Sequence, residues 1–340
     1  MTAREIEYIE LYARDNRDAA DYFVSSLGFR RIAESSGSDK NSILLRQGEV
    51  QLVVTAGPKT AEFLGVHGEG IADIAFGCDD VDATRAAVVA ADGVVLGYPD
   101  GNPVVSGFGG VNHTLLPASA RDHTQLPSGR SWTRIPELPN QPAGRIGKLD
   151  HIATCSESGS LANLTGFYRV AFGLDWYSRE YVEVADQAMD SVVLRSRSGG
   201  ITFTMLEPDT SRKPGQIDSF LDRNSGAGVQ HIAFLVDAIV PTVHEFRRQG
   251  VEFLHTPNAY YDALSERCFD MREEIAELCS ADVLADRDEW GYLLHLFTRS
   301  PYGRDTLFYE LVQRRGARGF GISNIRALYE AVERDRLVAG

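Results

Sequence analysis

Apolar and polar positions follow the same order in two pairs of segments along the chain. Residues 6–32 (IEYIELYARDNRDAADYFVSSLGFRRI) and 149–177 (LDHIATCSESGSLANLTGFYRVAFGLDWY) each predict a strand, a polar turn, an amphipathic helix and a return strand. Residues 70–95 and 228–253 form the second pair, and in both a predicted helix ends at a glycine before a new strand. The pattern therefore predicts an internal repeat.

The repeat predicts an α+β chain of four βαβββ-like modules arranged in two halves. In this alignment position 8 corresponds to position 151, and position 73 to position 231. A segment with four prolines and several polar residues separates the halves. We expect an N-terminal domain, a linker and a C-terminal domain at residues 1–120, 121–147 and 148–340.

Two further helical segments are predicted in the second half. Residues 259–291 form an insertion with a helical stretch, which either covers a pocket or is an ordinary solvated excursion. Residues 323–337 (SNIRALYEAVERDRL) predict an amphipathic helix with Ser323 as its N-cap. The apolar face of this helix must pack against another part of the protein.

Composition and charge exclude several classes of protein. The chain has 340 residues, of which 43% are apolar and 24% are charged, so it can bury substantial cores. A net charge of −14 without a basic stripe argues against nucleic-acid binding. No apolar run is long enough to span a membrane, and the start shows no signal-peptide pattern. The four cysteines lack CxxC spacing, so free thiols in a reducing cytoplasm are expected.

Three residues in the second half have the chemistry of a metal site. His151, His231 and Glu310 lie in the strand-like runs LDHIA, GVQHIAF and TLFYELV. Period-two alternation predicts that each points to the apolar, inward side, beside residues of the same face. These residues are Leu149, Ala153, Val229, Ala233, Phe308 and Val312. Two imidazoles and one carboxylate are typical of a facial iron(II) site with open positions for substrate and dioxygen.

The repeat itself favours a metal site over core packing. A single histidine among apolar residues is more often a core residue with satisfied hydrogen bonds than a ligand. In the first half, however, the matching positions hold Tyr8 and Asp73. Packing alone does not require two histidines and a glutamate at the matching places of one half only.

Three motifs give the chain a resemblance to a known family. GVQHIAF, TLFYELVQRRG and GFGISNIRALYEAVE resemble the C-terminal motifs of the 4-hydroxyphenylpyruvate dioxygenases and the related 4-hydroxymandelate synthases. The resemblance covers nearly the whole chain. It implies a vicinal oxygen chelate fold with two open barrel-like domains and a C-terminal helix over the active site. It also implies Fe(II) bound by His151, His231 and Glu310, with O2 as co-substrate and an arylpyruvate as substrate.

The resemblance also addresses the product. Both enzyme types oxidatively decarboxylate 4-hydroxyphenylpyruvate, giving either homogentisate, by ring attack, or 4-hydroxymandelate, by benzylic hydroxylation. The dioxygenases have a C-terminal motif similar to GFGxGNF, and this chain has GFGISNI, with Asn324 and Ile325 as its last two residues. The dioxygenases also have a motif similar to PxNEP, and this chain has TMLEP, with Thr204 and Leu206 at the proline and asparagine positions. Simple repacking also explains each exchange. Together they are similar to the synthase pattern and imply a role in supplying hydroxyphenylglycine building blocks for peptide antibiotics.

The remaining site residues are implied by the same resemblance. Polar residues expected to orient substrate are Ser191, Gln216 and Gln230, and the expected aromatic wall is Phe297, Phe308 and Phe320. Thr204, Asn324 and Ile325 complete the substrate pocket, and Ile325, Ser191, Phe297 and Gln230 are expected to influence the chemistry. Gln230 should face away from His231 in an ideal strand.

One departure from the family pattern lies in LLHLFT, where the family resembles LLQIFT. His295 is either a tolerated exchange in a polar corner of the pocket or a sign of a different arylpyruvate. An extradiol catechol dioxygenase shares the fold and metal ligands but is expected to lack the C-terminal motif. A binding protein on this scaffold usually lacks the full triad. The resemblance leaves a homodimer open.

Overall fold

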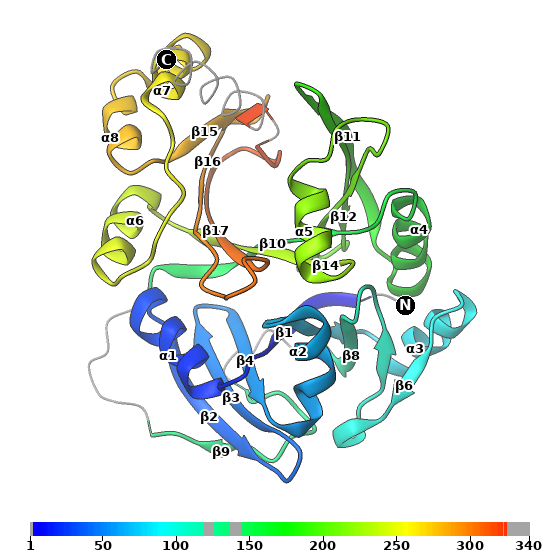
Figure 1. Ribbon diagram of the computed structural model, residues 1–340. Coiled ribbons are helices and arrows are strands. Elements are labelled where there is room, and N and C mark those ends of the chain that lie inside the picture. The colour runs from blue at the N-terminus through cyan, green and yellow to red at the C-terminus, as the bar shows by residue number, and fades with distance from the viewer. Residues whose placement is uncertain (1–2, 119–124, 137–143, 322, 325–340) are drawn as a thin grey trace.

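The computed structural model describes residues 3–118, 125–136, 144–321 and 323–324, and within them two curled sheets lie one against the other (Figure 1). Residues 3–134 contribute the nine strands of one sheet and residues 146–315 the eight strands of the other, counted over these described ranges. Both sheets carry helices along their outer sides. The predicted α+β fold is confirmed.

The first sheet has the strand order β6-β7-β8-β5-β1-β4-β3-β2-β9. Its strands are β1 (Ala3–Tyr12), β2 (Arg30–Ser36), β3 (Asn41–Gln47), β4 (Val50–Ala56), β5 (Gly70–Cys78), β6 (Val95–Gly97), β7 (Val104–Ser106), β8 (Asn112–Pro117) and β9 (Thr133–Arg134). Its helices are α1 (Asn16–Leu27), α2 (Ala61–His67) and α3 (Val81–Ala90), with 3-10 turns η1 (Pro58–Thr60) and η2 (Pro99–Gly101).

The second sheet has the order β11-β12-β13-β10-β14-β17-β16-β15. Its strands are β10 (Ile146–Cys155), β11 (Asp175–Val184), β12 (Gln187–Arg195), β13 (Thr202–Pro208), β14 (Gly228–Val236), β15 (Leu284–Arg287), β16 (Tyr292–Phe297) and β17 (Phe308–Arg315). Its helices are α4 (Leu161–Phe172), α5 (Gln216–Asn224), α6 (Ile239–Arg248), α7 (Asn258–Arg267) and α8 (Ile275–Ser280), with the 3-10 turn η3 (Phe269–Met271).

Local sequence explains where the repeated helices begin and end. Asp15 caps α1 by accepting hydrogen bonds from the backbone N–H groups of Arg17 and Asp18. The helix ends at Gly28, whose φ of 76° is readily adopted only by glycine. The partner helix α4 ends in the same way at Gly173, with a φ of 69°. Each half therefore repeats the same strand, helix and return strand.

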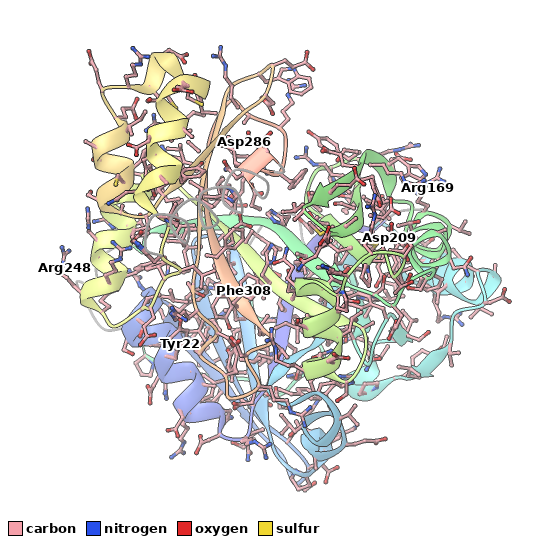
Figure 2. All side chains as sticks on the ribbon, turned by 45° about the horizontal axis from the view of Figure 1, so that its top comes forward. Tyr22, Arg169, Asp209, Arg248, Asp286 and Phe308 are labelled. Carbon is pink, nitrogen blue, oxygen red and sulfur yellow. The ribbon has the colours of Figure 1, made fainter. Side chains whose placement is uncertain are left out.

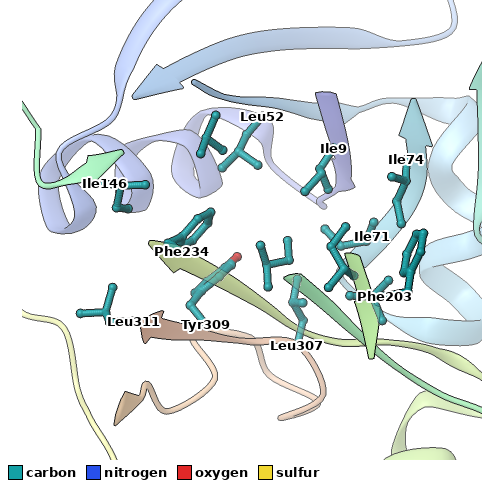
Figure 3. Close-up of a cluster of buried hydrophobic side chains, with 14 of the residues drawn as sticks. Ile9, Leu52, Ile71, Ile74, Ile146, Phe203, Phe234, Leu307, Tyr309 and Leu311 are labelled. Atoms are coloured by element: carbon teal, nitrogen blue, oxygen red, sulfur yellow. The ribbon is translucent and has the colours of Figure 1, made fainter. Parts of the chain in front are cut away.

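The largest core cluster lies between the two sheets (Figure 3). Ile9 and Leu52 from the first sheet face Phe234 and Tyr309 from the second, and all four are buried. Backbone pairing adds to this contact, because Glu49 N–H donates to the Gly147 carbonyl at 2.8 Å. The hydrophobic contact holds the halves in one arrangement, which leaves the opposite, concave side of the second sheet available for a site.

The strand registers match between the halves. Tyr8 pairs with Ala75 in the first sheet as His151 pairs with Ala233 in the second. Glu10 pairs with Asp73 as Ala153 pairs with His231. The alignment of positions 8 with 151 and 73 with 231 is therefore confirmed in three dimensions.

Several predictions concern segments at the borders of these elements. Within the expected linker, Thr133–Arg134 forms β9 and Ile146 starts β10, and the domain bounds at 120 and 148 stay a prediction. Residues 325–337 of the expected C-terminal helix, Ile325 among them, lie outside the described residues. The insertion at 259–291 contains α7, η3, α8 and β15, and its helices lie on the outer side of the second sheet (Figure 1).

Candidate metal centre

The three candidate ligands come from adjacent strands. His151 is on β10, His231 on β14 and Glu310 on β17, and these strands neighbour one another in the sheet. Ala233 pairs with His151 on one side and with Glu310 on the other. The sheet thus brings together residues that lie far apart in sequence, and all three side chains are almost fully buried.

Two β-bulges shape the centre. The pairing of β10 with β14 shifts between Leu149 and His151, and again where Ala153 pairs with His231 and Thr154 with Val229. A bulge lets consecutive side chains point to the same side of a strand. The expected strict alternation of Leu149 and Val229 with the ligands is therefore interrupted. The expectation that Gln230 faces away from His231 is wrong, because Gln230 Oε1 lies 3.2 Å from His231 Nδ1.

The geometry of the three side chains fits a metal ion. One nitrogen or oxygen atom from each lies within 4.8 Å of the other two. Glu310 Oε2 is 3.1 Å from His151 Nε2 and 3.4 Å from His231 Nε2. This buried oxygen has no hydrogen bond of normal geometry to any described residue. A buried carboxylate oxygen facing two imidazole nitrogens is satisfied by a cation, and the donor set is typical of iron(II).

The other atoms of the ligands are held by polar neighbours. His151 Nδ1 lies 2.9 Å from Asp150 Oδ2, so that Nδ1–H donates to the carboxylate and Nε2 is the nitrogen that faces the centre. Asp150 in turn accepts two hydrogen bonds from Arg314, at 2.7 and 2.8 Å. His231 makes the equivalent contact to Gln230. Each imidazole is thereby oriented with Nε2 toward the centre.

Charges in the centre stabilise an ionised Glu310. Burial opposes ionisation, but the surrounding imidazoles, His151 foremost, hold the pKa of Glu310 well below its usual range. Burial likewise opposes a charged His151, yet Glu310 and Asp150 raise its pKa to about 9. Burial lowers the pKa of His231. A metal ion bound at Nε2 would compete with the proton that these charges favour on His151.

His295 on β16 contacts a ligand directly. Its Nδ1 lies 2.7 Å from Glu310 Oε1, and its Nε2 lies 2.8 Å from Asn324 Nδ2. Among the described residues, the side chains whose ligand atoms are close enough to share a metal ion are His151, His231 and Glu310, and His295 is not one of them. His295 is thus bound to the carboxylate oxygen that does not face the histidines.

A cavity of about 490 Å³ opens from the three ligands. Its size is suitable for a small aromatic acid. His231 forms part of an aromatic wall: its ring stacks on Phe308 at 5.1 Å between centroids, and Phe320 meets His151 edge-on at 5.2 Å. In Figure 2, Phe308 lies near the middle of the view and Arg248 at its left edge.

The predicted pocket residues that the structure describes all line this cavity. They are Ser191, Thr204, Gln216, Gln230, His295, Phe297, Phe308, Phe320 and Asn324. The insertion contributes Leu284 of β15 to the lining, whereas none of the described residues of its helices α7 and α8 lines the cavity, so a covering helix is not found there. Val182, Met189, Leu206 and Ile217 add an apolar wall.

Sequence reasoning missed three residues of the centre. Asp150 directly precedes His151, and its role depends on a bulge that the apolar pattern does not reveal. Arg314 lies in the QRR run at the end of β17, where it also donates to the carbonyls of Ala317 and Gly319. Tyr260 in the insertion donates to Asn324 Oδ1 at 2.7 Å. Of the three, only Asp150 could have been found from the sequence, because an acidic residue stands next to a predicted histidine ligand.

Comparison with known proteins places the chain in a superfamily. The model of the Glyoxalase/Bleomycin resistance protein/Dioxygenase superfamily matches residues 5–106 and 148–296. The 4-hydroxyphenylpyruvate dioxygenase of Aspergillus fumigatus is 28% identical over 98% of this chain and 93% of that protein. The corresponding enzyme of Pyricularia oryzae is 31% identical over 81% of this chain and 70% of that protein.

A solved structure is similar over the whole chain. A mutant of 4-hydroxymandelate synthase from Streptomyces coelicolor is 48% identical, with a TM-score of 0.89, and the match covers 99% of this chain and 100% of that one. Fold and site thus define a vicinal oxygen chelate protein of the dioxygenase type. More narrowly, the chain belongs to the family of the 4-hydroxyphenylpyruvate dioxygenases and 4-hydroxymandelate synthases. The predicted resemblance, fold and dioxygenase class are confirmed.

The predictions on partners and location are tested only in part. Among the described helices, none is both long and apolar enough to cross a membrane. The homodimer, the absence of nucleic-acid binding and the cytoplasmic location stay predictions.

Proposed function

We propose that the chain converts 4-hydroxyphenylpyruvate and dioxygen into 4-hydroxymandelate and carbon dioxide at an Fe(II) ion held by His151, His231 and Glu310. The observation that carries this proposal is the 48% identity to a 4-hydroxymandelate synthase over both whole chains. Six 4-hydroxyphenylpyruvate dioxygenases that match are 27–31% identical. We further infer that the product serves as a precursor of hydroxyphenylglycine units in peptide antibiotics.

The bound ion would supply chelation of the 2-oxo acid and activation of dioxygen. The protein supplies orientation and exclusion of water. Phe297, Phe308 and Phe320 line the cavity beside the ligands and provide an apolar surface for the aromatic ring. Ser191 and Gln216 place polar groups in the same cavity, and Gln216 is the first residue of α5, held where Asp218 accepts from Gly215 N–H at 2.7 Å.

Two wall residues support benzylic hydroxylation. Leu206 presents an apolar side chain to the cavity, and the buried hydroxyl of Thr204 has no hydrogen-bond partner among the described residues. At these positions the wall therefore presents the apolar side chain of Leu206 and the hydroxyl of Thr204 to the substrate. A displacement of substrate on the order of 1 Å changes which carbon lies nearest the reactive oxygen. We propose that Leu206 shapes the pocket so that the benzylic carbon occupies that position. The family resemblance implies the same role for Ile325, which lies outside the described residues.

The reaction balances without another reductant. The substrate loses its carboxylate as carbon dioxide, and the former keto carbon becomes the carboxylate of the product by gaining one oxygen atom of dioxygen. The second oxygen atom enters the benzylic C–H bond as a hydroxyl. The two-electron oxidations at both carbons together reduce dioxygen fully, so no 2-oxoglutarate is required.

The test is to identify the product. The purified protein is loaded anaerobically with Fe(II), mixed with 4-hydroxyphenylpyruvate and exposed to air. Homogentisate and 4-hydroxymandelate are isomers of equal mass, so chiral chromatography against authentic standards must separate them before mass detection. We expect 4-hydroxymandelate. Homogentisate overturns the assignment of the product and makes the chain a ring-hydroxylating dioxygenase, whereas no turnover points to another arylpyruvate.

A further inference from the structure

Asn324 ties the described C-terminal end of the chain to the metal centre. Its side chain is buried, with 1% of its surface exposed, and Asn324 N–H donates to the Gly321 carbonyl at 3.0 Å. Gly321 has a φ of 72°, and a Cβ there would lie 2.7 Å from His295 Cε1. Only glycine therefore allows the chain to pass so close to His295 and present Asn324 to its ring.

A continuous series of hydrogen bonds runs from β15 to Glu310. Ala285 N–H donates to the Tyr260 hydroxyl at 3.0 Å. Tyr260 lies 2.7 Å from Asn324 Oδ1, and Asn324 Nδ2 lies 2.8 Å from His295 Nε2. His295 Nδ1 completes the series at 2.7 Å from Glu310 Oε1. Tyr260, Asn324 and His295 are all almost fully buried, so water does not compete for these contacts.

The donor and acceptor roles along this series are fixed by its ends. At one end the main-chain N–H of Ala285 can only donate to the Tyr260 oxygen, and the Tyr260 proton has two acceptors within reach, Asn324 Oδ1 at 2.7 Å and the Ala285 carbonyl at 3.0 Å. At the other end the Glu310 carboxylate can only accept, which requires a proton on the His295 nitrogen that faces it and selects the nearer acceptor, Asn324, for Tyr260. The amide then turns its NH2 group toward His295 Nε2, which must accept. The neutral imidazole consequently carries its proton on Nδ1 and donates it to Glu310 Oε1. A reversed amide would instead direct an Nδ1 lone pair at the carboxylate.

We propose that Tyr260, Asn324 and His295 are positioning residues that determine which oxygen of Glu310 binds the metal. His295 occupies Oε1, while Oε2 is the oxygen left without a hydrogen bond of normal geometry and facing both histidines. Glu310 is thereby restricted to one ligating oxygen. Single-oxygen ligation leaves the remaining positions of the centre for substrate and dioxygen. The proposal rests on the metal site of the proposed function but not on the identity of the product.

Tyr260 provides the sharpest test because it does not line the cavity and contacts neither substrate space nor ligands. Its neighbour Tyr261 provides a matched control. The two rings meet edge-on at 5.1 Å, and Tyr261 is also buried, but its hydroxyl takes no part in the series. Tyr260→Phe and Tyr261→Phe therefore remove the same atom from adjacent buried side chains.

The measurement is anaerobic titration of the metal-free full chain with Co(II), followed by visible absorption, which reports both affinity and coordination. Loss of an outer-shell partner typically weakens metal affinity by about 10–100-fold. We expect Tyr260→Phe to weaken Co(II) binding by about 10-fold and to change the absorption bands, and Tyr261→Phe to leave both unchanged. Circular dichroism checks that the variants are folded.

A second pair of variants separates the hydrogen bonds from packing. In His295→Gln, the amide NH2 can donate to Glu310 and the amide oxygen can accept from Asn324, so affinity should stay within about threefold of the natural protein. His295→Leu removes both hydrogen bonds and should weaken binding by about 10–100-fold. Equal affinities of the Tyr260 and Tyr261 variants, or of the two His295 variants, overturn the proposal. If the natural protein itself binds no Co(II), the proposed metal site falls as well.

Discussion

The two halves of the chain place different side chains at matching strand positions. Tyr8 and Asp73 occupy in the first sheet the places that His151 and His231 occupy in the second. In the parallel pair of β5 and β8, Asp73 is paired with Asn112, and in the parallel pair of β14 and β17, His231 is paired with Phe308. Two residues further along β8 and β17, Thr114 therefore corresponds to Glu310. The same backbone therefore builds a polar cluster in both halves.

The polar groups of the first half satisfy one another. Asp73 accepts hydrogen bonds from Thr114 N–H and from the Thr114 hydroxyl, at 2.9 and 2.8 Å. Glu10 pairs with Arg130, which reaches the cluster from the segment between β8 and β9, and accepts from the Thr55 hydroxyl at 2.6 Å. In the second half, Ala153 stands in the place of Glu10 and brings no charge.

The difference shows that buried polarity alone does not make a metal site. In the second half, Asp150, Gln230 and His295 each hold the atom of a ligand that faces away from the centre. One nitrogen or oxygen of each candidate ligand faces the centre, and these atoms lie within 4.8 Å of one another. In the first half, the matching side chains direct their polar atoms at one another instead. A metal site needs unsatisfied lone pairs that share a direction.

Replacement of Glu310 should have the largest effect on activity, and replacement of the matching residue Thr114 should have almost none. Glu310→Ala removes one of three ligands, so we expect turnover of 4-hydroxyphenylpyruvate to fall well beyond the roughly 100-fold typical of an outer-shell change. Thr114→Ala removes the hydroxyl at the corresponding place and should leave kcat within about twofold. Oxygen consumption measured with Fe(II)-loaded protein checks both. Persistent turnover in Glu310→Ala means that the ligand assignment is wrong.

Arg130 allows the same comparison to be made for stability. Its side chain is 9% exposed, and that of Glu10 is 3% exposed. Arg130→Met leaves the Glu10 charge buried without its partner, which should lower the free energy of unfolding by about 3–5 kcal/mol. The double variant Arg130→Met with Glu10→Met removes both charges and should recover most of this loss. Urea unfolding measures each value.

Activity of the Arg130 variants distinguishes the two halves further. At a temperature where the single variant is still folded, its kcat should equal that of the natural protein, because the ion pair belongs to the half without ligands. A single variant that loses less than about 1 kcal/mol would contradict the expectation that Glu10 is left as a buried, unpaired charge.

The sequence predicted the three candidate ligands because the repeat supplied an internal reference, and it predicted most of the cavity residues because the family resemblance implied them. The histidines of the second half stand out only when they are aligned with Tyr8 and Asp73. What surrounds the ligands was less accessible. Asp150 and Gln230 act through bulges, which break the period-two pattern used to assign strand faces. The contact of Tyr260 with Asn324 joins residues 64 positions apart, and nothing in the pattern pairs them.

Asp73 provides the most specific test of the first half, because its effect on stability should change with pH. Burial, with Glu10 adding repulsion, raises the pKa of Asp73 from 3.8 to about 7. Between these values the carboxyl stays protonated in the folded protein but ionises in the unfolded chain. The unfolded state then binds fewer protons, so this group lowers stability as pH rises from about 4 to 7, by up to about 4 kcal/mol at 1.4 kcal/mol per unit.

Asp73→Asn should remove this pH dependence. The amide cannot ionise, so the stability of the variant relative to the natural protein should increase steadily from pH 4 to pH 7, whatever constant difference the altered contact with Thr114 adds. Asp82→Asn on α3, where the carboxylate is 89% exposed, is the control and should show a constant difference. Urea unfolding at four pH values gives both slopes. Parallel curves for Asp73→Asn and the natural protein would mean that Asp73 is ionised in the fold, balanced by Arg130, and that the first half holds two carboxylates rather than one.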